Sequence, residues 1–212
     1  MAAYTHILFD HDGVLVDTEP LYFRATRQVL ASLGVDLETT AYLELQAEGA
    51  NAWHQALDLG HSEARVAQKR AERNVLYQQF LSTEPIDIPG VEGVLAQLER
   101  RFTMAIVTTA KRSDFDLIHA NRSITSYMDL ILTNGDYARS KPCPDPYLKA
   151  LSCLGIAPDA ALVVEDSERG LRSAVAAGIH CAVVHHPFTA TQDFSAATYR
   201  LNSLHDLLGL LQ

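Results

Sequence analysis

Two carboxylates separated by a single residue follow the first apolar run of the chain. Asp10 and Asp12 flank His11 directly after the segment 6–9, and Gly13 comes next. Such a pair can divide the work of a reaction, because one carboxylate can attack as a nucleophile while the other gives or takes a proton. Gly13 allows the sharp turn that this placement needs. The alternative, an Asp-Gly turn without chemistry, is weakened by the apolar residues on both sides.

Further polar residues follow two later apolar segments. Thr108 comes directly after the apolar segment 104–107, and Glu165 and Asp166 come directly after 161–164. If these segments are parallel strands of one sheet, their carboxyl ends meet at the same edge, where ligands of open α/β sheets bind. We therefore expect all these side chains to converge with Asp10 and Asp12 in one crevice.

The pattern of apolar residues predicts the elements that position this crevice. Residues 17–84 carry long helical stretches with hardly any strand signal, whereas strand and helix patterns alternate from residue 85 onward. The strand before Asp10 finds its partners only in that second part. We therefore predict a Rossmann-like, doubly wound α/β core with a parallel sheet over 1–16 and 85–212, and an inserted α-helical cap domain over 17–84.

Individual elements can also be placed. The predicted strands are 6–10, 104–107, 129–132, 161–164 and 180–184. Ser62 is a candidate N-cap of a cap helix whose buried face is predicted to hold Ala64, Ala67, Ala71 and Val75. The last helix is expected to start at Ser203.

In combination, the polar segments resemble the motifs of the haloacid dehalogenase-like (HAD) superfamily. The matching strings are Asp10-His11-Asp12-Gly13-Val14-Leu15-Val16-Asp17-Thr18, Thr108 after Ile106-Val107, Lys141-Pro142-Cys143-Pro144-Asp145-Pro146-Tyr147, and Glu165-Asp166-Ser167-Glu168-Arg169-Gly170. The resemblance covers nearly the whole predicted core. It implies a phosphohydrolase in which phosphoryl transfer depends on positioning and on neutralising negative charge.

The resemblance also implies a role for each matching residue. Asp10 corresponds to the nucleophile that forms an aspartyl-phosphate, and Asp12 to the acid and base that serves the leaving group and then water. Thr108, Thr109 and Lys141 correspond to the groups that bind the phosphate.

A cation is also expected, because carboxylates next to a phosphate would repel it. The implied cofactor is Mg²⁺, which prefers oxygen ligands. Its expected ligands are Asp10, the backbone carbonyl of Asp12, Asp166, and Glu165 directly or through water. His11 is expected to pack beside the strand end without a catalytic role.

The predicted cap is similar to that of beta-phosphoglucomutases, phosphoglycolate phosphatases and sugar-phosphate phosphatases. Tyr22, Asn51 and Trp53 are the cap residues expected to contact the substrate, with burial in the cap core as the alternative for Trp53. The mutases carry a His where this chain has Tyr22, and basic residues where it has Glu48 and Ala52. These differences favour a singly phosphorylated substrate.

The expected function is therefore a Mg²⁺-dependent phosphatase acting on a small phosphorylated metabolite, such as a sugar phosphate. The alternative is a phosphoryl-transferring mutase of the beta-phosphoglucomutase type. A dehalogenase is disfavoured, because those relatives lack the second acid that Asp12 supplies. A non-catalytic binding module would be favoured only by a missing motif residue, and every motif is present.

Composition restricts partners and location. The 212 residues correspond to about 1.4 typical domains, and 48% are apolar, which suffices for a sizeable core. With 17 Lys and Arg against 26 Asp and Glu, the net charge of −9 argues against nucleic acid or a membrane surface as a partner. The N-terminus lacks the basic segment of a signal peptide, and three widely spaced cysteines indicate no disulfide framework. We expect a cytoplasmic protein, monomeric or weakly dimeric.

Overall fold

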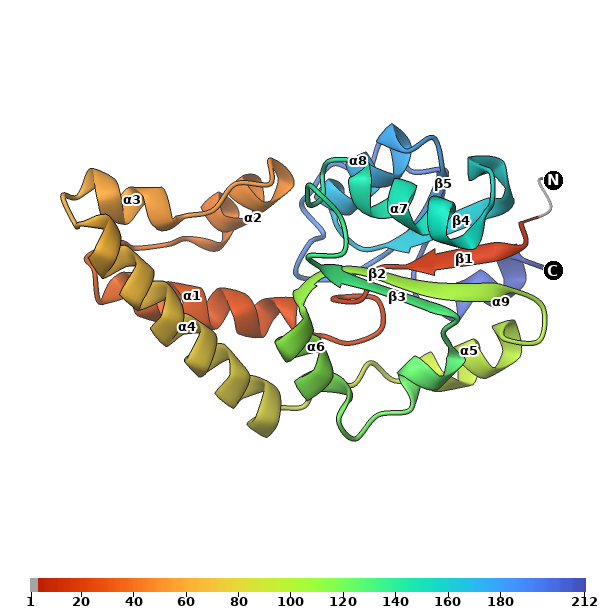
Figure 1. Ribbon diagram of the computed structural model, residues 1–212, viewed down its shortest axis with the longest axis horizontal. Coiled ribbons are helices and arrows are strands. Elements are labelled where there is room, and N and C mark those ends of the chain that lie inside the picture. The colour runs from red at the N-terminus through yellow and green to blue at the C-terminus, as the bar shows by residue number, and fades with distance from the viewer. Residues whose placement is uncertain (1–3) are drawn as a thin grey trace.

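The computed structural model describes residues 4–212 and has a parallel β-sheet at its centre (Figure 1). The six strands are β1 (His6–Phe9), β2 (Thr103–Lys111), β3 (Leu130–Asn134), β4 (Ala161–Glu165), β5 (His180–Val184) and β6 (Tyr199–Leu201). They lie in the order β3-β2-β1-β4-β5-β6, and every neighbouring pair is parallel. The predicted doubly wound α/β fold is confirmed. Residues 1–3, at the start of the predicted core, lie outside the described residues.

The register of the sheet brings the ends of its central strands level. Phe9 in β1 pairs with Ile106 in β2 and with Val164 in β4. The residues that follow these three positions therefore lie side by side at the carboxyl edge of the sheet. Asp10 is one of them, and its backbone N–H donates to the carbonyl of Val164 at 2.8 Å.

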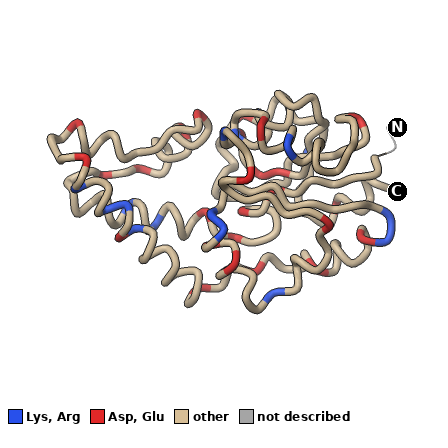
Figure 2. Tube along the Cα trace, viewed as in Figure 1, with Lys and Arg blue, Asp and Glu red and all other residues tan. Residues whose placement is uncertain are grey.

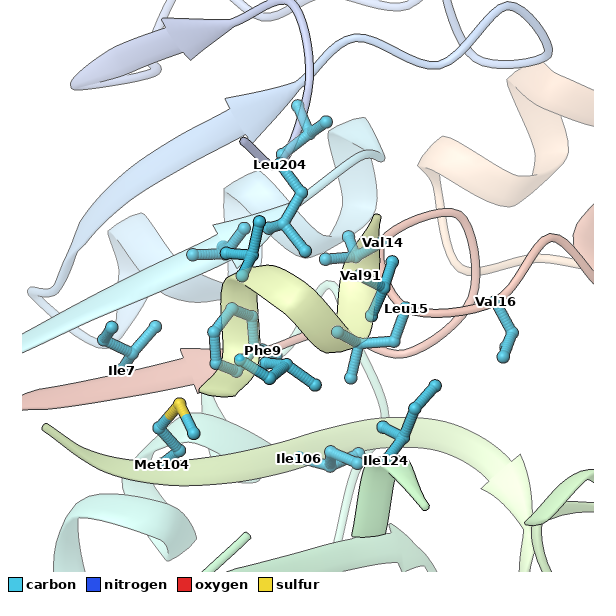
Figure 3. Close-up of a cluster of buried hydrophobic side chains, with 14 of the residues drawn as sticks. Ile7, Phe9, Val14, Leu15, Val16, Val91, Met104, Ile106, Ile124 and Leu204 are labelled. Atoms are coloured by element: carbon cyan, nitrogen blue, oxygen red, sulfur yellow. The ribbon is translucent and has the colours of Figure 1, made fainter. Parts of the chain in front are cut away.

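Helices cover both faces of the sheet (Figure 1). The helices of the core are α5 (Val91–Leu98), α6 (Arg112–His119), α7 (Asp145–Leu154), α8 (Glu168–Ala176) and α9 (Asp206–Leu210), with 3-10 turns at Ile124–Tyr127 and Pro158–Ala160. Side chains of α5, α6 and α9 pack on one face together with Phe9, Met104 and Ile106 (Figure 3). Side chains of α7 and α8 pack on the other face.

Four of the five helices between β1 and β2 in the sequence form a separate unit beyond the carboxyl ends of the strands (Figure 1). They are α1 (Glu19–Ala31), α2 (Thr39–Ala47), α3 (Trp53–Asp58) and α4 (Glu63–Thr83), and they share an apolar cluster of their own. The chain enters and leaves this helical cap side by side, because Asp17 N donates to the carbonyl of Ile86 at 2.8 Å. The division at residues 16/17 and 84/85 stays a prediction.

Several local predictions differ from the structure. The short strand β6 was not predicted. The last helix starts at Asp206 rather than Ser203, and Asn202 and Ser203 precede it in a turn in which their backbone N–H groups donate to the Asp206 carboxylate. β2 runs on to Lys111 through a shift in its register, so Thr108 lies within the strand.

The predicted buried face of α4 is wrong, although its N-cap is correct. The Ser62 hydroxyl accepts a hydrogen bond from Arg65 N at 3.2 Å. The buried residues of α4 are Val66, Arg73, Tyr77 and Leu81, while Val75 is 57% exposed. The alanines of the predicted face are exposed as well. They favour the helix through their propensity and do not mark the side that packs.

No helix in residues 4–212 is both long enough and apolar enough to cross a membrane. Cys143, Cys153 and Cys181 are all free thiols in this part of the chain, as their spacing predicts.

Candidate active site

Buried charged groups gather at the carboxyl ends of β1, β2 and β4. Lys141, from the loop before α7, is 3% exposed and donates hydrogen bonds from Nζ to three oxygens. These are Asp10 Oδ1 at 2.5 Å, Glu165 Oε1 at 2.7 Å and the carbonyl of Val107 at 2.8 Å. An ammonium has three donors, so the hydrogen-bonding capacity of Lys141 is fully used. Burial alone would lower the pKa of Lys141, but Asp10 and Glu165 raise it, and the side chain stays cationic.

Asp10 lies in surroundings that carry more negative than positive charge. Burial, followed by the nearby Glu165 carboxylate, raises the pKa of Asp10 to about 7, although Lys141 acts in the opposite direction. A single lysine therefore does not neutralise the carboxylates that converge here. An additional cation would favour the ionised form of Asp10.

Three carboxylates are arranged so that they could hold that cation. Oxygens of Asp10, Glu165 and Asp166 lie within 4.8 Å of one another, and all three residues are buried. Within residues 4–212 no side chain or backbone group donates a hydrogen bond to the Asp166 carboxylate, which is otherwise unusual for a buried charge. Burial and the charges of Asp10 and Glu165 raise its pKa well above the ordinary value. An oxygen-rich cluster of this kind fits a hard divalent cation.

Two glycines make room for this cluster. Gly13 has φ of +81°, and a Cβ there would lie 2.0 Å from Asp166 Oδ2. A Cβ at Gly170 in α8 would lie 1.8 Å from Glu165 Oε1. Neither position can accept a side chain without moving a carboxylate, so the Asp-x-Asp-Gly and Glu-Asp-Ser-x-x-Gly strings depend on each other sterically.

Asp12 lies beside this cluster in a different environment. Thr18 donates a hydrogen bond to Asp12 Oδ1, and the Thr108 hydroxyl donates to Oδ2 at 3.4 Å. Burial alone would raise the pKa of Asp12, but His11, Thr18 and Arg169 outweigh it and lower the pKa to about 2. Two neighbouring carboxylates therefore have pKa values pushed apart, which is typical of groups with different tasks in a reaction.

A cavity of about 350 Å³ lies between this cluster and the helical cap. Asp12 and Lys141 line it from the core, and Tyr22, Asn51 and Trp53 line it from the cap. The predicted crevice and the predicted cap residues thus line one cavity, large enough for a small metabolite.

Comparisons with known proteins agree with this geometry. The family model described as "Haloacid dehalogenase-like hydrolase" matches residues 7–184. The chain belongs to this family. Protein CbbY of Rhodobacter capsulatus is 30% identical, with 93% of this chain and 92% of that protein aligned. A phosphorylated carbohydrates phosphatase of Thermotoga maritima is 31% identical over 84% of this chain and 85% of its own length.

A solved structure is similar over nearly the whole hydrolase. A CbbY mutant from Rhodobacter sphaeroides, in complex with xylulose-(1,5)bisphosphate, matches with a TM-score of 0.79 and 27% identity. The match covers 96% of each chain. The similarity therefore includes the helical cap as well as the core, and the resemblance predicted from the motifs is confirmed.

The two threonines predicted to bind phosphate differ in accessibility in this hydrolase. Thr108 is fully buried, and besides its contact with Asp12 its hydroxyl accepts a hydrogen bond from Ala110 N at 3.0 Å. Thr109 lines the cavity. Their roles stay predictions, and Thr109 is the one that a ligand in the cavity can reach without a rearrangement.

Sequence reasoning missed a second polar group that connects cap and core. Glu19, at the start of α1, lies 3.8 Å from Arg169 of α8 and accepts a hydrogen bond from Tyr42 of α2. Glu19 and Arg169 both line the cavity. Arg169 lies inside one motif string, and Glu19 directly follows another. Their positions in the sequence could therefore have indicated them as site residues.

Glu48 does not act on the cavity as the sequence suggested. Its carboxylate pairs with Arg172 of α8 at 3.0 Å, outside the residues that line the cavity within the described chain. Arg73 of α4, which the wrongly assigned helix face concealed, does line it. The charge that a substrate meets on the cap side is therefore more positive than the sequence indicated.

Proposed function

We propose that this hydrolase is a Mg²⁺-dependent phosphatase that releases phosphate from a small phosphorylated sugar or a similar phosphomonoester through an aspartyl-phosphate. The observation that carries the proposal is the position of Asp10, held by Lys141 and flanked by Asp12 on one side and the carboxylate cluster on the other. The relative from Thermotoga maritima, a phosphorylated carbohydrates phosphatase, supports the substrate class.

The chemistry assigns one step to each carboxylate. A carboxylate oxygen of Asp10 forms a bond to phosphorus while the bond from phosphorus to the leaving oxygen breaks, and a proton from Asp12 goes to that oxygen. Asp12 then takes a proton from water, whose oxygen attacks phosphorus and releases Asp10 and inorganic phosphate. The low pKa of Asp12 keeps it ionised, as it must be to accept a proton from water. To protonate the leaving oxygen, Asp12 first needs a proton, which must arrive with the substrate.

Mg²⁺ fits the carboxylate cluster better than a soft metal, because only oxygen ligands are offered. When bound, it would be held by Asp10, Asp166, Glu165 and the carbonyl of Asp12, and it would neutralise charge on the phosphate. Glu165 already accepts hydrogen bonds from Lys141, Tyr147 and Ser167, which orients its oxygens for this purpose.

The cluster predicts that protons and Mg²⁺ compete. Because the pKa of Asp10 is raised to about 7, this carboxyl is largely protonated at pH 6 and ionises as the pH rises, and the raised pKa of Asp166 acts in the same direction. We expect the increase in Tm caused by millimolar Mg²⁺ to be several times larger at pH 8 than at pH 6. Thermal unfolding with Mg²⁺ and with EDTA at both pH values measures it.

Asp166→Asn is the matched variant for this measurement, since it removes one expected ligand and keeps the side chain's shape. Its Tm should respond little to Mg²⁺ at either pH. Equal Mg²⁺ shifts at pH 6 and pH 8 in the unmodified protein would contradict the coupling between protonation and metal binding.

The function itself is tested by phosphate release over a panel of phosphorylated metabolites with Mg²⁺, with the Asp10→Asn variant measured in parallel. We expect release from one or more sugar phosphates, dependent on Mg²⁺ and on Asp10. If no phosphomonoester is hydrolysed faster by the protein than by the variant, the proposal is wrong.

The cap places a cationic side chain, Arg73, at the cavity. This indicates a substrate that carries oxygen atoms or negative charge at that end. Arg73 is 4% exposed, lines the cavity and stacks on the Tyr22 ring at 4.1 Å. Its hydrogen bonds go to the uncharged Thr26 and Asn74, both at 3.0 Å, and within residues 4–212 it forms no ion pair. Burying a guanidinium without a carboxylate partner costs free energy, and a hydrogen bond to a substrate oxygen would offset that cost.

Arg73 is one of four basic residues on α4 (Figure 2): Arg65, Lys69, Arg70 and Arg73.

Replacing Arg73 by Met should therefore separate binding from stability. We expect KM for the best substrate to rise roughly 10-fold to 100-fold, as the loss of a charged hydrogen bond predicts, while kcat changes less. Tm should stay the same or rise, because the variant no longer buries a charge. Arg65→Met, at an exposed position of the same helix, is the control and should change neither value. An unchanged KM in Arg73→Met would remove Arg73 from the substrate site.

The alternative, a phosphoryl-transferring mutase, gains no specific support. Tyr22 lies in the cavity at the position where those mutases carry a histidine, and its ring packs edge-on against Tyr77 at 5.1 Å. A phenol is a poorer proton relay near neutral pH than an imidazole. From the sequence we also propose that the protein is cytoplasmic and monomeric or weakly dimeric. The proposed boundaries are 1–16 and 85–212 for the core and 17–84 for the cap.

A further inference from the structure

Two histidines from separate elements meet next to Asp12, the proposed acid and base. His11, between Asp10 and Asp12, is fully buried, and its Nε2 lies 2.8 Å from Nε2 of His119 at the end of α6. The other ring nitrogen of His11, Nδ1, lies 3.5 Å from Asp12 Oδ1. Phe115 packs against both imidazoles, with ring centroids 5.0 and 4.5 Å away. A chain of two imidazoles thus leads from α6 to Asp12.

The proton positions in this chain follow from its contacts. A hydrogen bond between two Nε2 atoms needs a proton on one of them and a lone pair on the other. If His119 donates, His11 carries its proton on Nδ1, and that N–H faces the Asp12 carboxylate. If His11 donated as a neutral ring, the lone pair of Nδ1 would face the carboxylate instead, and the two would repel each other. Between neutral rings, electrostatics therefore selects His119 as the donor, and a His11 protonated on both nitrogens would likewise present its Nδ1–H to Asp12.

The unpartnered atoms favour the same arrangement. Nδ1 of His11 and Nδ1 of His119 are both buried without a hydrogen-bond partner that meets normal geometry. With His119 as donor, its Nδ1 holds only a lone pair, which costs less to leave unpaired than an N–H. The remaining N–H, on His11, then lies 3.5 Å from Asp12 Oδ1. Contacts of this kind are often long before substrate binds.

We propose that His119 is a positioning residue which, through the tautomer of His11, holds the Asp12 carboxylate in the orientation needed for proton transfer to the leaving group. Asp12 is otherwise held on Oδ1 by Thr18 and on Oδ2 by the longer contact from Thr108. The imidazole chain adds a third contact, from residues that do not line the cavity. The inference rests on the proposed phosphatase function, because it concerns a step of that reaction.

The test compares substrates that do and do not need a proton on the leaving oxygen. The His119→Phe variant keeps an aromatic ring beside Phe115 and removes the donor, whereas His119→Gln keeps an N–H donor. For the best alkyl phosphate from the panel, we expect kcat/KM to fall roughly 10-fold in His119→Phe and to recover most of that loss in His119→Gln. For p-nitrophenyl phosphate, whose leaving group departs without a proton, kcat/KM should change less than about twofold. Asp116→Asn, exposed on the same helix, is the control and should leave both values unchanged.

A second variant shows whether His119 acts through His11. His11→Leu should show the same loss for the alkyl phosphate and spare p-nitrophenyl phosphate, and adding His119→Phe to it should cause no further loss. If His119→Phe does not fold, His11→Leu alone decides by the same substrate comparison.

The outcomes separate this inference from the proposed function. Equal losses on both substrates, or unchanged activity in His119→Phe and His11→Leu, overturn the inference while the phosphatase function stands. Absence of phosphate release by the unmodified protein from any phosphomonoester overturns the function itself.

Discussion

Replacing Asp10 by Asn should reduce phosphate release by roughly 10³-fold or more, because an amide cannot supply the attacking oxygen. Asn has the same shape as Asp, so the cavity keeps its form. The variant also removes one of the charges that raise the pKa of Asp166. In the absence of Mg²⁺ we therefore expect its Tm to be equal to or higher than that of the unmodified protein.

The measurement is phosphate release at saturating substrate, together with rapid-quench detection of phosphate bound covalently to the protein. Labelled phosphate should be transferred to the unmodified protein and not to Asp10→Asn. Asp116→Asn, an exposed carboxylate on α6, should retain both signals and serves as the control. Undiminished activity in Asp10→Asn would show that another group attacks phosphorus.

The core of the site was predictable from sequence because parallel strands impose a simple geometry. Once 6–9, 104–107 and 161–164 are identified as buried parallel strands, the residues after them must lie at one edge of the sheet. Pairing of Phe9 with Ile106 and Val164 places Asp10 and Glu165 close together, as expected. The convergence of these residues needed only a parallel sheet that contains all three strands; the order of the strands was not predicted.

The cap resisted prediction because its helices bury polar side chains and expose apolar ones. Val75 is exposed in α4, whereas Arg73 is buried against the Tyr22 ring. A pattern based on polarity assigns these two residues to the wrong sides, since a guanidinium can pack on an aromatic ring as an apolar surface would. The contacts of Glu48 with Arg172 likewise depend on how cap and core meet, which no local pattern contains.

His11 shows a different limit. Its burial beside the strand end was expected, and it is fully buried. Its hydrogen bond to His119 joins residues 108 positions apart, and only the packing of α6 on the sheet brings them together. Sequence could place each histidine in an element, but it could not show that they form a pair.

Replacing Lys141 by Met should cost both activity and stability, and the two losses should respond differently to Mg²⁺. Lys141 is the only lysine that contacts Asp10 among the described residues, and it also holds Glu165. Removing one partner of a buried ion pair typically costs about 3–5 kcal/mol, because the remaining charge is left uncompensated. Burial and Glu165 already raise the pKa of Asp10, so without the lysine this carboxyl should take up a proton more readily.

Mg²⁺ should restore part of the stability of Lys141→Met, since a cation at the carboxylate cluster neutralises the same charges. It should not restore activity, because the ammonium beside the attacking Asp10 carboxylate is lost; removing a donor that stabilises charge in the transition state costs roughly 10²-fold to 10³-fold in kcat. Tm with and without Mg²⁺, and kcat at saturating Mg²⁺, measure the two effects separately. Lys149→Met, exposed on α7, provides the control.

The combination of results in Lys141→Met distinguishes a lysine that only balances charge from one that acts on the substrate. If Mg²⁺ restored kcat together with Tm, the lysine would serve merely to neutralise Asp10 and Glu165. We expect Tm to recover and kcat to stay low, because Nζ of Lys141 lies 2.5 Å from the attacking carboxylate and Lys141 is one of the residues that line the cavity. A cation bound by the carboxylates occupies a different position and cannot donate hydrogen bonds from there.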